Sequence, residues 1–222
     1  LHCSSAASDV YKRQLYHNVT GNYNTAIGRG AGARFLQSNS TALGYYAGHY
    51  ASGSNNTFVG SEAGKGGTTS APYSSGTYNT AIGANALDAF TSGYSNIAIG
   101  PDAAGAITTG NQNVAIGRYT GYQLTDGTKN VLVGNSAGEN LSTNTNHNVM
   151  VGFQAGEHAD GATTAAINNA YFGYQAGRYM DDGQNNIAIG YQPMYANSSE
   201  GNSGHELIAI GYQALYSVTD AD

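Results

Sequence analysis

A five-residue pattern of polar and apolar positions recurs along most of the chain. Most copies read Asn, a β-branched residue, a small residue, a second aliphatic residue and Gly, as in the stretch "NVAIG" that ends at Gly117. Some copies carry Phe, Leu, Met or Tyr at the small position. The glycines that end the copies are Gly28, Gly44, Gly60, Gly83, Gly100, Gly117, Gly134, Gly152, Gly173, Gly190 and Gly211, spaced by 16, 16, 23, 17, 17, 17, 18, 21, 17 and 21 residues. This spacing predicts a repeat protein.

The alternation inside each copy predicts a β-strand. In "NVAIG", Val114 and Ile116 point to one face, while Asn113 and Ala115 point to the other. Because both faces are mostly apolar or small, we expect a parallel strand that is buried on both sides. The few residues between Asn and Gly are too short a run for a helix.

The rest of each period has the composition of turns. A pair of small residues follows most of the glycines, as at Ala47-Gly48, and suits a tight corner of the backbone. The remaining residues are mainly Asn, Ser, Thr, Asp and Gly. One period is therefore one rung, and the chain is predicted to be an all-β parallel β-solenoid, or β-roll, of about eleven rungs of 16–18 residues.

The predicted rungs stack identical positions into columns. The Asn column, which includes Asn96 and Asn113, predicts an amide ladder.

A small coil has a thin core, and the second apolar face of its strands needs a cover, so we expect a homotrimer. A column that begins Thr25, Thr41, Thr57 and Thr80 leaves ice binding open as an alternative. The column continues with Ile97, Val114, Val131, Val149, Ala170, Ile187 and Ile208, which is typical of a packing surface.

The first residues do not follow the period. The stretches "SSAAS" and "DVYKRQ" back-translate into a sequence similar to a transposase sequencing adapter. We interpret residues 1–14 as an adapter scar of metagenomic assembly or a disordered tail. Residues 15–222 are predicted to be a single β-solenoid domain and a fragment of a longer fibre.

Composition limits the classes of function. The chain carries 8 basic and 14 acidic residues, with a net charge of −6 and no basic run, which disfavours nucleic acid as a partner. The single cysteine, Cys3, lies within residues 1–14, outside the predicted solenoid, so neither disulfides nor thiolate sites are expected. No apolar run is long enough for a membrane helix. Histidines and acids lack ligand-spaced partners, so we expect no catalysis, cofactor or metal. A glycan-degrading solenoid stays an alternative, although its clustered acids are not seen here.

The copies ending at the repeated glycines resemble the head repeats of trimeric autotransporter adhesins, whose units read "NSVAIG", and the repeat shafts of phage tail fibres. "YQAG" at Tyr174 and "YQAL" at Tyr212 are similar to the "NTAIGYQAL" arrays of such proteins. The resemblance covers about residues 21–216, and the rungs are longer than the shorter adhesin repeats. It implies a trimeric, fibrous, extracellular protein of a bacterial cell surface or a phage virion, used for attachment or as a spacer.

Two neighbouring columns are candidates for glycan contact, because aromatic faces and amide groups together can hold sugar rings. The alternative is that these side chains only stack on themselves along the fibre. Three insertions, at about 65–76, 159–167 and 196–204, are expected along one edge, where a host-surface glycan or protein receptor would bind. The two columns are Phe153, Tyr174, Tyr191 and Tyr212, followed by Gln154, Gln175, Gln192 and Gln213.

Overall fold

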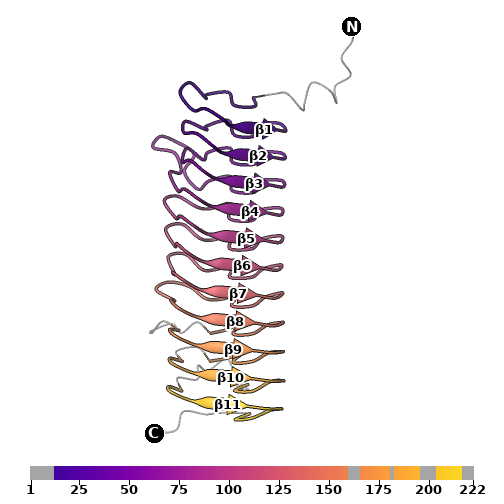
Figure 1. The fold of residues 1–222 in the computed structure, drawn as a ribbon. Coiled ribbons are helices and arrows are strands. Elements are labelled where there is room, and N and C mark those ends of the chain that lie inside the picture. The colour runs from indigo at the N-terminus through magenta and orange to yellow at the C-terminus, as the bar shows by residue number, and fades with distance from the viewer. Residues whose placement is uncertain (1–12, 160–165, 181–182, 196–203, 217–222) are drawn as a thin grey trace.

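The computed structural model describes residues 13–159, 166–180, 183–195 and 204–216, which form one column of stacked rungs (Figure 1). Every strand is three residues long and there is no helix in the described part of the chain. The strands are β1 (Thr25–Ile27), β2 (Thr41–Leu43), β3 (Thr57–Val59), β4 (Thr80–Ile82), β5 (Ile97–Ile99), β6 (Val114–Ile116), β7 (Val131–Val133), β8 (Val149–Val151), β9 (Ala170–Phe172), β10 (Ile187–Ile189) and β11 (Ile208–Ile210). The predicted parallel β-solenoid is confirmed.

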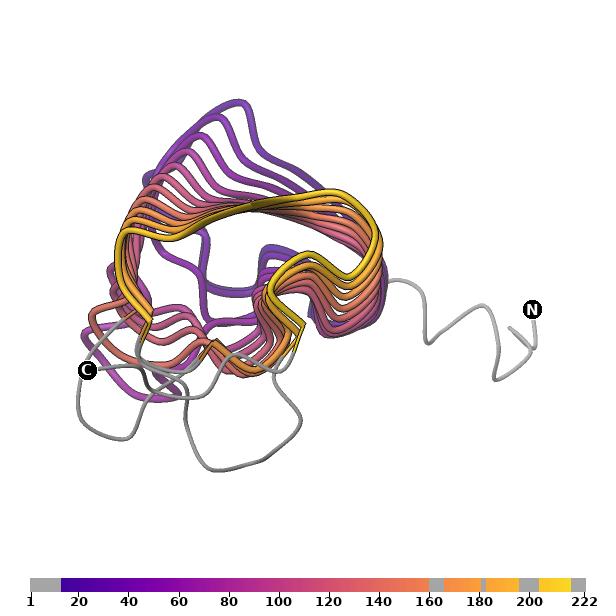
Figure 2. The same cartoon turned by 90° about the horizontal axis from the view of Figure 1, so that it is seen from below.

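All the strands belong to one parallel sheet whose spatial order is the order of the sequence. The register aligns copy on copy: Thr57 pairs with Thr80 across the longest interval, and Thr80 then pairs with Ile97. Extra residues between strands therefore leave the register unchanged. Seen along its axis, the rod is a closed coil with the rungs nearly superposed (Figure 2).

Each strand ends at its repeated glycine for a conformational reason. At all these glycines φ lies between 124° and 139°, a region that side chains rarely adopt. The amide of Ala31 then donates to the carbonyl oxygen of Gly28 at 3.1 Å, which closes the corner predicted from the small residues. The alanine of this corner points into the coil and is fully buried.

Three kinds of side chain fill the narrow core. The central residue of each strand points inward, the corner alanine lies beside it, and an apolar residue seven positions after most of the repeated glycines completes the rung. Large and small residues alternate between these positions. Phe58 lies at the centre of β3, whereas β4 has Ala81 at its centre and is filled by Phe90, whose ring centroid lies 5.6 Å from that of Phe58.

The asparagine before most strands forms the predicted ladder. The side-chain oxygen of Asn96 accepts bonds from the backbone amide and from Nδ2 of Asn113, both at 3.1 Å. Nδ2 of Asn113 also donates to the carbonyl oxygen of Gly127 at 2.7 Å. Asn113 is buried, and so are the asparagines at the same place in the neighbouring rungs. A buried polar column is stable because its groups are paired.

The expectation that both faces of each strand are buried is wrong for the chain by itself. Ala98, at the centre of β5, is fully buried, but its neighbour Ile97 is 39% exposed. The reason is geometric: the coil closes over one face of the sheet only, and residues on either side of the central one point outward. The outer face of the sheet is therefore open in the single chain.

Candidate functional site

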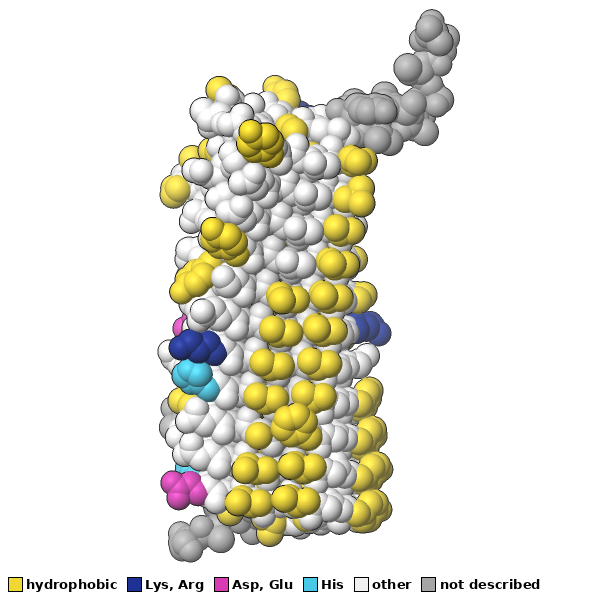
Figure 3. Space-filling model, in the orientation of Figure 1, with side chains coloured by type: hydrophobic (Ala, Val, Ile, Leu, Met, Phe, Trp, Pro, Cys, Tyr) yellow, Lys and Arg dark blue, Asp and Glu magenta, His cyan; other side chains and the backbone are white. Residues whose placement is uncertain are grey.

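The open face of the sheet carries two parallel columns of side chains. One column starts with threonine on β1 to β4 and becomes apolar from Ile97 onward, as the register shows. The other is apolar on every strand, from Ile27 to Ile210. Figure 3 shows the hydrophobic side chains as one column over the upper rungs and two over the lower ones. An apolar patch of this length marks an interaction surface.

The aromatic column beside this face is a continuous stack. The ring centroids of Phe153 and Tyr174 lie 5.4 Å apart, those of Tyr174 and Tyr191 5.0 Å apart, and those of Tyr191 and Tyr212 5.3 Å apart. In each pair the ring planes differ by 8°, so neighbouring rings cover both faces of Tyr174 and of Tyr191. The edges of these rings remain available to solvent.

The four glutamines form an amide column next to the rings. Nε2 of Gln175 donates to Oε1 of Gln154 at 2.7 Å, and Nε2 of Gln192 donates to Oε1 of Gln175 at the same distance. Gln213 extends the series with a bond of 3.2 Å to Gln192. All four residues have φ between 49° and 54°, and Gln175 is buried within the column. The predicted columns thus exist as two ladders, and their contact with glycan stays a prediction.

A second aromatic group lies on the lower rungs and was not predicted. The rings of His158 and Tyr179 stack with centroids 4.9 Å apart, and those of Tyr195 and Tyr216 stack at 5.3 Å. The Arg178 guanidinium lies 4.9 Å from the ring centroid of Tyr179. The only signal in the sequence was an aromatic residue or histidine five or six positions after a repeated glycine.

Of the three insertions, the structure describes the first. Residues 65–76 are tied to neighbouring rungs: the amide of Gly67 donates to the carbonyl oxygen of Phe90 at 2.8 Å, and that of Ser52 to the carbonyl oxygen of Ser74 at 2.7 Å. The insertions at 159–167 and 196–204 lie mostly outside the described residues, at 160–165 and 196–203. Their common edge therefore stays a prediction, as does the interpretation of residues 1–14, of which 1–12 lie outside the described part.

Within the described ranges, no three His, Cys, Asp or Glu residues are grouped as ligands for a metal ion. The same part of the chain contains no helix that is long and apolar enough to cross a membrane. In comparisons with known proteins, no family model, no curated protein and no solved structure matches the chain.

Proposed function

We propose that the chain is a segment of a homotrimeric, surface-exposed fibre that serves attachment. The observation that carries this proposal is the long apolar face of the sheet, which the coil leaves open. Ile97, Ile116 and Ile189, on three different strands, are each between 36% and 39% exposed. Copies of the same chain are the occupant that fits best, because an identical face has the same width, the same rung spacing and no charge to desolvate.

Three chains with their open faces around one axis would bury this surface and thicken the thin core. The copies of the five-residue pattern resemble the heads of trimeric autotransporter adhesins and phage tail-fibre shafts. This resemblance supports a fibre outside the cell, on a bacterial surface or on a virion. Attachment would use a glycan or protein receptor on a host surface. The proposal includes no catalysis. The threonine column covers only β1 to β4 and then becomes apolar, so ice binding is not favoured.

Assembly is tested by placing charge on the open face. We expect the unaltered chain to have the mass of three chains by light scattering, and the double variant Ile116→Lys, Ile189→Lys to have the mass of one. Both side chains point outward, so lysine can be accommodated by the coil, but two buried charges per chain would oppose association. Circular dichroism should show that the variant keeps its β-structure.

The control for this experiment is Gln123→Lys, which adds one positive charge at an exposed position after β6, away from the sheet. This variant should keep the mass of the unaltered chain. A folded monomer of the unaltered chain at micromolar concentration would contradict the trimer and leave the solenoid fold intact.

The ring column is tested by the triple variant Tyr174→Ala, Tyr191→Ala, Tyr212→Ala. Because neighbouring rings already cover the faces of Tyr174 and Tyr191, we expect a lower melting temperature and unchanged binding to a glycan array. Each stacked pair that is lost should cost about 0.5–1.5 kcal/mol. Loss of glycan binding by a variant that keeps its fold and its mass would instead assign the sugar contact to this column.

A further inference from the structure

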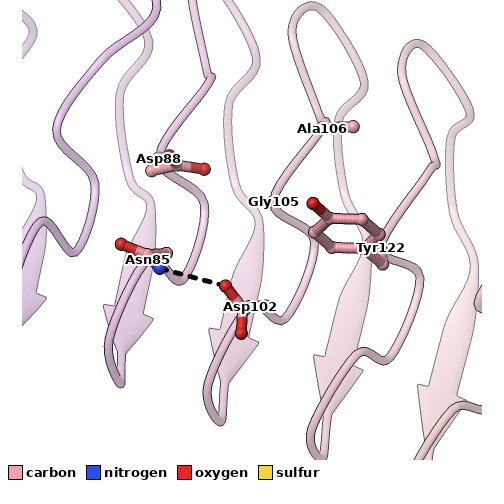
Figure 4. Close-up of a pocket in the computed structure, with 6 residues that line it drawn as sticks. All are labelled: Asn85, Asp88, Asp102, Gly105, Ala106 and Tyr122. Atoms are coloured by element: carbon pink, nitrogen blue, oxygen red, sulfur yellow. Dashed lines mark hydrogen bonds between the residues drawn. The ribbon is translucent and has the colours of Figure 1, made fainter.

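A hollow lies on the corner side of the coil, where residues two and five positions after the repeated glycines face each other. Asn85 and Asp88 follow β4, Asp102 and Gly105 follow β5, and Tyr122 follows β6. These residues line a cavity of about 300 Å³ together with Ala106 (Figure 4). Its volume is at the lower end of the range for small-molecule sites.

The hollow exists because two successive residues that line it, both after β5, have almost no side chain. Gly105 and Ala106 stand where Tyr122 and Gln123 stand in the next rung. A Cβ atom at Gly105 would already lie 3.2 Å from the ring of Tyr122. The space is thus bordered by side chains of the rungs before and after it, and it is open to solvent.

Other rungs close the same place with polar contacts. After β3, Nζ of Lys65 donates to Oε2 of Glu62 at 2.7 Å. This bond joins the residue two positions after the glycine to the residue five positions after it. After β8, Nε2 of Gln154 donates to Oε1 of Glu157 at 2.8 Å, and Arg178 from the next rung donates to Oε2 of Glu157 at 2.5 Å. At the hollow beside β5, neither Asn85 nor Asp102 is hydrogen-bonded to Asp88 or Tyr122.

The groups around the hollow have the chemistry of a sugar site. Nδ2 of Asn85 donates to Oδ1 of Asp102 at 3.1 Å, which orients that carboxylate and leaves its second oxygen available (Figure 4). No hydrogen bond joins the Asp88 carboxylate to another residue of the described ranges, and burial raises the pKa of its carboxyl group. Carboxylate oxygens accept hydrogen bonds from sugar hydroxyls, and a phenol ring packs against the C–H face of a sugar. Tyr122 is 41% exposed and supplies that ring.

We propose that the hollow between Asp88, Asp102 and Tyr122 binds one hexose unit of a glycan that carries no acidic group. The ring of Tyr122 would pack on the sugar, and the two carboxylates would accept hydrogen bonds from its hydroxyl groups. Sialic and uronic acids are excluded, because two carboxylates line the hollow and the chain has a net charge of −6. This assignment rests on the proposed attachment function and gives it a place and a ligand class.

The test uses the full chain on an array of oligosaccharides that end in neutral hexoses, amino hexoses or sialic and uronic acids. We expect binding to the first two groups and none to the third. Tyr122→Leu and Asp102→Asn should each weaken binding about tenfold or more, since each removes a direct contact with the ligand. The matched control is Tyr94→Leu: this tyrosine is 45% exposed, similar to Tyr122, but does not line the hollow. It should bind like the unaltered chain.

Circular dichroism and mass in solution show that each variant is folded and assembled as the unaltered chain is. Equal binding by Tyr122→Leu and the unaltered chain would overturn the assignment. So would a preference for acidic glycans, or binding that requires added Ca²⁺ but does not require the ring of Tyr122. If Tyr122→Leu still attaches to host cells, the hollow is not the sugar site, while the proposed attachment function stands. If the unaltered, assembled chain attaches to neither cells nor the array, both proposals fail.

Discussion

Replacing Gly117 with valine is expected to disrupt the stack at β6 and to lower the melting temperature strongly. Gly117 has a φ of 134°, where a side chain costs about 1–3 kcal/mol in backbone strain. A Cβ atom there would lie 2.5 Å from the carbonyl oxygen of Gly134 in the next rung. Backbone cannot move aside cheaply, so overpacking adds about 1–3 kcal/mol more. Chemical denaturation followed by circular dichroism measures the loss.

Two controls separate the causes of this loss. Gly211→Val has a similar φ of 124°, but its Cβ atom would meet no atom of the described residues within 4 Å, so it should show the strain without the clash. Thr125→Ala should be nearly neutral, since the hydroxyl of Thr125 has no hydrogen-bond partner in the described ranges. Equal melting temperatures for Gly117→Val and Thr125→Ala would refute the stacking explanation.

Replacing Asn113 with leucine should have the second large effect, because it interrupts the buried amide ladder. The side-chain oxygen of Asn113 accepts bonds from the backbone amide and from Nδ2 of Asn130, both at 3.0 Å. Leucine has a similar size, so the loss comes from polar groups left unpaired inside the coil, among them the Asn130 amide and the Gly127 carbonyl. Each unpaired group costs about 1–3 kcal/mol. Urea unfolding of the folded variant measures the sum.

Asn111→Leu makes the same chemical change two residues away and serves as the control. The side chain of Asn111 is only half-buried and forms no hydrogen bond with the described residues. This variant should unfold at nearly the same urea concentration as the unaltered chain. If the two leucine variants were equally stable, the ladder would contribute nothing measurable.

Periodic features of the fold could be predicted from the sequence because each is repeated many times. The register of the strands, the positive φ of corner glycines such as Gly48 and the ladder through Asn113 all depend on a residue type that recurs at one place in the rung. Repetition makes such a position visible without an alignment. The third core column, which includes Phe90 and Leu124, was equally periodic but was overlooked, because its residues vary between aromatic, aliphatic and small.

Features that occur once along the rod could not be predicted. The hollow depends on Gly105 and on side chains from three different rungs, and the residue types at these rung positions change from one rung to the next. The open face was misjudged for another reason: alternation shows that two faces differ, but not which of them the coil itself covers. That depends on the direction of the corner after each strand, which is set by backbone angles.

Nearly all contacts between the described strands run from each strand to its immediate neighbours. Cooperativity in such an array is of the nearest-neighbour kind, so the array has no single folding nucleus on which all rungs depend. The number of rungs can then change without a change in the stability that each rung contributes. Each duplicated rung would extend the rod by roughly 4.8 Å and bring its own share of core, corner and ladder.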